Sequence, residues 1–176
     1  MKAQKINIFL FKGFGSAQFH YKVGNATNTA VIVKTNSNSV FGGFTKANWN
    51  TPSGYAGDFD AFLYSLRRNG TSGARKFNNG GARDRSSSYN INTDIKYGPS
   101  FGASAYDLTI VSYSNKNTGS LSYLGHSYQL PSECTYNSVC ANSFLAGSFT
   151  GWLTTEIEVY QMIDPVTTSV KPGMQF

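Results

Sequence analysis

The chain has few charged residues and few residues of the types that hold metal ions. Of its 176 residues only 14% are charged, and it has two cysteines and two histidines. Zinc sites need a set of Cys and His ligands at suitable spacing, which this composition supports poorly. The sequence therefore predicts no metal site and no cofactor. Its length fits one domain that can bury a core without metal or disulfide staples.

Long apolar runs are also missing. No run approaches the roughly 20 residues that a membrane helix needs, and the run at 6–11 is interrupted by Asn7. Lys2 and Lys5 precede a stretch too short for a signal peptide, and no small-residue cleavage site follows. We expect a soluble protein without a membrane span, either cytoplasmic or secreted and present as a mature form with a starting Met.

The motifs of common enzyme and nucleotide sites do not occur. There is no Gly-x-Ser-x-Gly elbow, no Gly-Lys-Ser/Thr phosphate loop and no EF-hand pattern. His20, on an expected helix, and His126, in an expected strand, are the candidate imidazole bases, and a structural role is favoured for both. Asp58 and Asp60 precede a strand, where loop capping is favoured over cation binding.

Glu156 and Glu158 form the one carboxylate pair with a regular spacing. On a strand they share a face about 7 Å apart, so they could in principle serve as acid and base. Their simpler role is to keep an outer strand face hydrated and to pair with basic side chains. We assign no catalytic residues and favour a protein that is not an enzyme. An enzyme is the weaker alternative, and it would require Glu156, Glu158 and His126 to come together in a cleft.

The residues that are abundant indicate a β fold. Hydrophobic residues make up 40% and aromatic residues 15% of the chain, which also has 18 glycines. A helix is expected at 16–23, with Ser16 as its N-cap and with Phe19 and Val23 on one face. Strands are expected at 6–11, 30–33, 39–41, 61–66, 106–113 and 152–162.

These short strands predict a β-dominated (α+β) fold, in the form of a two-sheet antiparallel β-sandwich with a few short helices. The strands at 30–33 and 39–41 should form a hairpin, and the strand at 61–66 should be buried on both faces. In the last strand, Ile157 and Val159 should point one way and Glu156 and Glu158 the other. Gly42 and Gly43 lie in an aromatic strand, where a backbone or a large ring should approach too closely for a Cβ.

Basic residues are concentrated in one part of the chain. The net charge is +6, and the cluster consists of Arg67, Arg68, Arg75, Lys76, Arg83 and Arg85. We interpret this Gly/Asn-rich region as a flexible loop, either merely solvated or able to meet an acidic protein, a phosphate or an anionic lipid. Few aromatics lie among these residues to stack on bases, so nucleic acid is not expected. The candidate interaction residues are Arg67, Arg68, Arg83, Arg85, Glu156 and Glu158.

Cys134 and Cys140 lie close together in a polar segment. They could form a small disulfide, which would suggest an oxidising compartment, or they could be two thiols of a cytosolic protein. The sequons at Asn25 and Asn69 fit a secreted protein, but such triplets also arise by chance. The compartment stays open.

Several sequence blocks together resemble the TLDc domain family. The blocks are GF at 13–14 with FH at 19–20, YGPSFG at 97–102, DLTI at 107–110, LGHSYQLP at 124–131, SFLAGS at 143–148 and EIEVY at 156–160. They resemble the family's "DGF…FH", "YGPTFG…DLYI", "LGxSYxLP", "FLAGS" and "EIEVF", in the same order over residues 6 to 162. A single TLDc-like domain at 1–164 and a C-terminal tail at 165–176 are therefore expected.

The resemblance implies a two-sheet β-sandwich flanked by a few helices. It also implies a link to oxidation resistance, and to the peripheral sector of the vacuolar proton pump, which several members bind as regulatory modules. Lys12 stands where "DGF" has Asp, and Val23 stands where many members have Cys, which removes one candidate for a thiol-based antioxidant role. The leading hypothesis is a non-enzymatic protein-interaction module, with pump subunits as its partner. The alternative is a secreted, disulfide-containing β-sandwich that binds an extracellular ligand such as a glycan or a matrix component.

Overall fold

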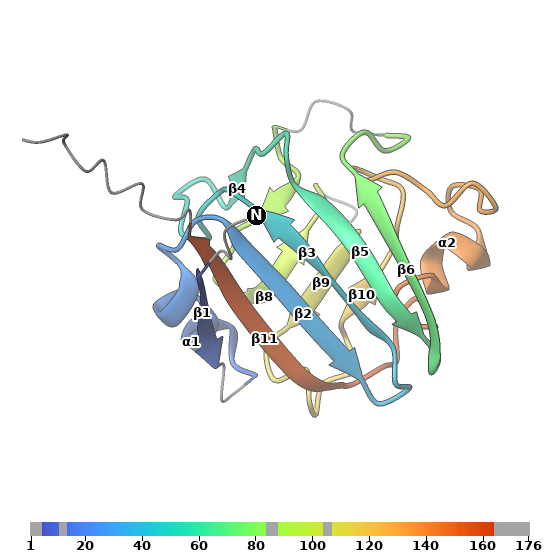
Figure 1. Cartoon of the computed structure of the whole chain (residues 1–176), viewed down its shortest axis with the longest axis horizontal. Helices are drawn as coiled ribbons and strands as arrows, with labels where there is room; N and C mark the ends of the chain where they lie inside the picture. Colours follow the sequence, from blue (N-terminus) through green and yellow to red (C-terminus); the bar gives the residue numbers. More distant parts are fainter. Residues whose placement is uncertain (1–4, 11–13, 84–87, 104–106, 164–176) are drawn as a thin grey trace, which may run out of the picture.

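The computed structural model describes residues 5–10, 14–83, 88–103 and 107–163. Within them the chain forms two antiparallel sheets that lie face to face, with two short helices beside them (Figure 1). The predicted β-dominated two-sheet antiparallel β-sandwich with short helices is confirmed. Neither helix in these ranges has the length and apolarity that crossing a membrane requires. The predicted tail, 165–176, lies outside the described residues.

The larger sheet has six strands in the order β1-β11-β2-β3-β5-β6, and the smaller has five in the order β10-β9-β8-β7-β4. The strands of the larger sheet are β1 (Lys5–Leu10), β2 (Thr29–Thr35), β3 (Val40–Thr45), β5 (Phe62–Arg68), β6 (Thr71–Asn78) and β11 (Thr154–Ile163). Those of the smaller sheet are β4 (Tyr55–Ala56), β7 (Ile91–Asn92), β8 (Tyr97–Phe101), β9 (Leu108–Val111) and β10 (Leu121–Ser122). The helices are α1 (Ser16–Val23) and α2 (Val139–Ser143).

The core fills the space between the two sheets. The larger sheet contributes Val31, Val33, Phe41, Leu63, Ile157 and Val159, and the smaller contributes Ile91, Phe101, Leu108 and Ile110, all of them buried. Trp49 lies among them, with its ring edge-on to Phe101 at 5.4 Å and to Phe19 of α1 at 5.2 Å. Its indole N–H donates to Thr29 Oγ1 at 3.0 Å, so the polar atom of this buried ring has a partner.

The central strands follow the alternation that the sequence predicts. β2 alternates between buried and half-buried residues along its whole length, and it pairs antiparallel with β3, so the predicted hairpin is confirmed. In β11, Ile157 and Val159 are buried, whereas Glu156 is exposed and Glu158 is half-buried on the other face. That prediction is confirmed as well.

The two glycines of β3 lie against a neighbouring backbone and a large ring, as the sequence predicts. A Cβ on Gly42 would lie 1.7 Å from the carbonyl oxygen of Val31, and one on Gly43 would lie 2.5 Å from Cζ of Phe101. The first contact is with another backbone and the second is with a large ring from the opposite sheet. Glycine is therefore required at both positions.

Four local predictions are wrong. The strand at 61–66 is not buried on both faces, because β5 alternates and leaves Phe62 and Tyr64 half-buried on the outer face. There Phe62 is covered by neighbouring side chains, with Phe44 stacked at 5.3 Å and Lys76 Nζ 4.0 Å from its ring centroid. Ser16 is the first helical residue and not the N-cap; its backbone N–H donates to Ser112 Oγ.

His126, expected in a strand, lies in a bend outside the strands. The strand predicted at 106–113 is β9 and ends at Val111, two residues before Tyr113, which has a φ of +57° that a strand cannot continue through. The position of residue 106 lies outside the described residues.

Candidate functional site

Most of the basic region is a β-hairpin, which corrects the predicted flexible loop. Arg67 and Arg68 end β5, and Arg75 and Lys76 lie on β6, the edge strand of the larger sheet. The turn between them is Asn69-Gly70, with φ values of +46° and +83°. Positive φ at both central residues is the geometry that Asn-Gly favours in two-residue hairpins. That dipeptide is the sequence signal from which the hairpin could have been predicted.

An irregularity in β5 directs Arg68 toward the inner side of the sheet. Ser65 pairs with Phe41 of β3, and Arg67 pairs with Val40, which is adjacent to Phe41 in β3. β5 therefore contains one extra residue between the two pairs. Strict alternation would have placed Arg67 on the same face as Ser65. The extra residue reverses this, as a bulge does, and Arg68 and Ser65 line the same pocket.

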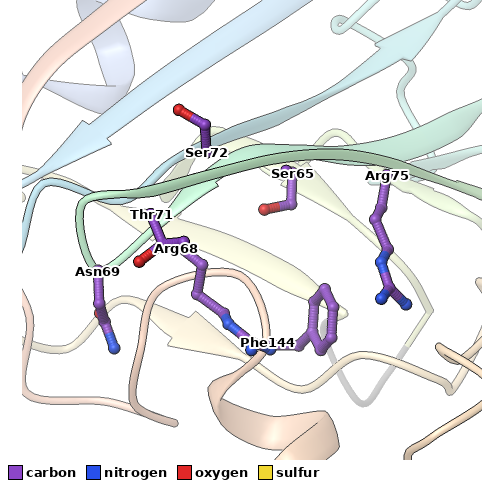
Figure 2. A pocket seen from close by; sticks show the side chains of 8 residues that line it. Ser65, Arg68, Asn69, Thr71, Ser72, Arg75 and Phe144 are labelled. Carbon is purple, nitrogen blue, oxygen red and sulfur yellow. The ribbon is translucent and has the colours of Figure 1, made fainter.

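This pocket, of about 380 Å³, lies between the hairpin and Phe144, which follows α2. Its lining residues are Ser65, Arg68, Asn69, Thr71, Ser72, Gly73, Arg75 and Phe144. Figure 2 shows the Arg68 and Arg75 side chains extending toward Phe144 from its two sides. The guanidinium carbons lie 4.6 Å and 5.7 Å from the ring centroid, at cation–π distance. The ring also packs edge-on against Phe77 of β6 at 5.4 Å, which fixes its position.

The two arginines differ in their electrostatic partners. Arg75 Nη1 lies 2.7 Å from Glu133 Oε1 and 2.9 Å from Oε2, so its charge is balanced. The backbone N–H of Glu133 itself and then the Arg75 guanidinium hold the pKa of the Glu133 carboxyl below its usual value. Arg68 forms no ion pair with any carboxylate of the described residues. Within the described part of the chain, the pocket thus keeps one uncompensated positive charge.

The other predicted interaction residues lie elsewhere. Arg67 Nε donates to the carbonyl oxygen of Asn38 at 2.9 Å, and Arg83 lies over the ring of Tyr136, 5.2 Å from its centroid. Glu156 and Glu158 lie on the outer face of β11. Arg85 lies outside the described residues.

The structure therefore does not bring the five described residues of this set together, and of these five only Arg68 lines the pocket. Arg75 and Phe144 complete the pocket. Arg75 belonged to the basic cluster but was not among the predicted interaction residues. Phe144 was noted only as part of the SFLAGS block, and the sequence did not indicate that it lines a pocket, because its position depends on the fold.

A family model for the TLDc domain matches residues 10–163. The chain belongs to the TLDc domain family. The match covers the smaller sheet, both helices, the pocket and the larger sheet except residues 5–9 of β1, so the resemblance drawn from the sequence blocks is confirmed for the fold. A search of the curated proteins gives no match.

The LGHSY block of the TLDc domain folds around one buried carboxylate, that of Asp107. Asp107 Oδ1 accepts the backbone N–H groups of Gly125 at 2.7 Å and His126 at 2.9 Å, and Oδ2 accepts that of Ser127 at 2.8 Å. Tyr128 N lies 3.4 Å from Oδ1. Burial raises the pKa of Asp107 to about 7, and these donors act in the opposite direction. The role that follows is to hold the loop.

The histidines and the acidic residues have structural partners. His20 is buried, with Nε2 3.0 Å from the carbonyl oxygen of Tyr97 and Nδ1 3.2 Å from Asn50 Oδ1. Asp58 accepts from Thr45 Oγ1 and from backbone N–H groups, which is the loop capping that the sequence predicted. His126 adjoins β9 in the smaller sheet, whereas Glu156 lies on the outer face of the larger sheet.

Cys134 and Cys140 are joined in the structure, with their Cα atoms 5.4 Å apart. The bond closes the turn that leads into α2 and hence into Phe144. The disulfide that the sequence allowed therefore adjoins the segment that forms one wall of the pocket.

Proposed function

We propose that this TLDc domain is a protein-interaction module, not an enzyme, and that it binds its partner through the β5–β6 hairpin. The observation that supports this is the exposure of β6, where the six residues from Thr71 to Lys76 are all exposed at the sheet edge. An edge strand presents backbone N–H and C=O groups that a second chain can pair with. Basic side chains on the same hairpin favour an acidic partner.

The partner we propose is the peripheral sector of the vacuolar proton pump, and the cellular role is protection against oxidative stress. This choice rests on the resemblance to a family in which several members engage that sector. The basic side chains of the β5–β6 hairpin support one part of this proposal, namely an electrostatic contribution to binding. Exposed charges act over about one Debye length, roughly 8 Å at physiological salt, so binding should weaken as the salt concentration rises.

The test is reconstitution of the purified chain with the purified peripheral sector. The variant Arg67→Glu/Arg68→Glu should lose at least tenfold in affinity in a sedimentation or interferometry assay at 150 mM salt. Lys22→Glu/Lys116→Glu changes the net charge equally, at an exposed position on α1 and at an exposed position in the turn after β9. This control variant should bind like the unmodified chain. Equal loss in both variants, or no binding by the unmodified chain together with turnover of a substrate, would reject the proposal.

The joined cysteines favour a second candidate, a secreted β-sandwich that binds an extracellular ligand such as a glycan. The two candidates differ in where the protein resides and in whether the pair is oxidised there. The mass of the protein taken from its native source, alkylated with and without reductant, separates them. An oxidised pair together with a native signal peptide supports the second candidate, and free thiols support the first.

A further inference from the structure

Arg68 lies over an aromatic ring and has no anionic partner among the residues that the structure describes. Its guanidinium carbon lies 4.6 Å from the centroid of the Phe144 ring, and no carboxylate of the described residues pairs with it. A guanidinium stacked through its face keeps its in-plane N–H donors available, and two of them match the geometry of one carboxylate. The ring restricts the side chain, so less entropy is lost when a ligand binds.

The charge of the pocket suits a single negative charge. Arg68 and Arg75 contribute two positive charges, and Glu133 balances that of Arg75 at 2.7 Å. One positive charge is left, and it belongs to Arg68. A carboxylate would neutralise the site, whereas a phosphate dianion would leave an excess negative charge beside Glu133.

The remaining lining adds hydroxyl and amide groups to a concave space. Ser65, Asn69 and Thr71 line the pocket together with Arg68, and its volume of about 380 Å³ lies in the range of small-ligand sites. Ser65 is buried at the floor, whereas Asn69 and Thr71 are exposed at the turn of the hairpin. Ser72, Gly73 and Arg75 of β6 are exposed as well, so the pocket is open along the hairpin, next to the proposed docking edge.

We propose that this pocket receives one aspartate or glutamate side chain of a partner protein, with Arg68 as the specificity-determining residue. The carboxylate accepts two N–H groups of Arg68, and the hydrocarbon part of the side chain packs on the Phe144 ring. This inference rests on the proposed function and names the chemistry of one of its contacts.

The test uses small probes, so it does not depend on the identity of the partner. N-acetylglutamate amide, N-acetylglutamine amide and N-acetylphosphoserine amide are titrated into the ¹⁵N-labelled full chain at 150 mM salt. The glutamate probe should give saturable NMR shifts at Arg68 Nε and at the Ser72 and Gly73 amides, and the neutral glutamine probe should give none. Arg68→Gln should weaken glutamate binding at least tenfold, whereas Lys22→Gln, with the same charge change on α1, should leave it unchanged.

Three results would overturn the assignment. Equal shifts with the glutamate and glutamine probes would show that charge is not recognised, and equal weakening in the two variants would show only a general electrostatic effect. A tenfold preference for the phosphoserine probe would make the pocket a phosphate site. If the glutamate probe binds but the pump sector does not, the pocket stands and the proposed partner is rejected; the reverse result rejects the pocket alone.

Discussion

Gly43 of β3 faces the ring of Phe101 of β8 across the sandwich. A Cβ on this glycine would come within 2.5 Å of the ring carbon Cζ. Phe101 is itself held by Trp49 at 5.4 Å and by Tyr128 at 6.2 Å, and all three rings are buried. The ring therefore has no direction in which to move, and the spacing between the sheets at this point depends on the missing side chain.

Gly43→Ala should destabilise the domain by about 1–3 kcal/mol, the usual range for overpacking a core. For a domain of this size that corresponds to a fall in Tm of roughly 3–10 °C. Gly73→Ala is the matched control, because a Cβ at that position of β6 meets nothing within 4 Å. Thermal unfolding of the two variants checks the prediction, and equal melting temperatures for both would contradict the packing at Phe101.

Asp107→Asn should also destabilise the domain. The amide keeps one acceptor oxygen but places an NH₂ group where Oδ2 accepts the Ser127 N–H at 2.8 Å, so two donors face each other in a buried site. An unsatisfied buried donor costs about 1–3 kcal/mol. Chemical denaturation measures the difference. Burial disfavours the ionised carboxylate. Unchanged stability would therefore mean that the cost of burying the Asp107 charge cancels the contribution of its hydrogen bonds.

The effect of Asp107 should depend on pH. Its pKa of about 7 in the folded protein exceeds the value of about 3.9 for an unfolded aspartate. The folded state therefore binds the proton more tightly, so this carboxyl's contribution to the free energy of unfolding is present below pH ~4 and is lost as the pH rises through ~7. From pH 5 to pH 8, the free energy of unfolding of the unmodified chain should therefore fall relative to that of Asp107→Asn. A constant difference would contradict the raised pKa.

The fold could be predicted from the sequence where local pattern and packing agree. The β2–β3 hairpin and the two faces of β11 follow from alternation, and Gly42 and Gly43 mark close approach. The prediction for β5 failed because Phe62 and Tyr64 are apolar on a face that a second sheet does not cover. Sequence shows that such rings are apolar, but it does not show that Phe44 and Lys76 lie against Phe62.

The pocket was harder to predict than the fold. The cluster of basic residues was visible, but the side of the sheet that each one faces depends on the extra residue in β5. Glu133 is far from Arg75 in sequence, and only the folded chain brings them together. Tertiary pairing of this kind leaves no local periodicity, which is why Arg68 and Arg67 could not be told apart beforehand.

The disulfide gives a prediction about the stability of the oxidised protein, whichever partner the domain binds. Closing a loop between residues six apart in sequence should contribute about 2 kcal/mol by restricting the unfolded chain. Reductant should lower the Tm of the oxidised protein by roughly 4–8 °C. The double variant Cys134→Ser/Cys140→Ser should melt at the lower temperature with or without reductant. A protein whose two thiols alkylate fully without reductant would contradict the bond.

The ion pair between Glu133 and Arg75 should limit the affinity of the pocket for anions. The backbone N–H of Glu133 and the Arg75 guanidinium lower the pKa of the Glu133 carboxyl. The carboxylate therefore stays ionised at neutral pH and remains paired with Arg75. Glu133→Gln removes that charge and leaves two positive charges for a ligand. Removing a like charge from beside the bound carboxylate lowers the electrostatic cost of binding at a screened surface, which predicts a gain of roughly three- to tenfold in affinity for the glutamate probe.

Glu158→Gln is the control for this gain, because it changes the net charge equally but lies on the outer face of β11. The same NMR titration measures both variants. A similar gain in both would mean that the probe responds to the overall charge of the domain. A gain confined to Glu133→Gln, abolished again by adding Arg68→Gln, would place the anion between the two arginines and Phe144.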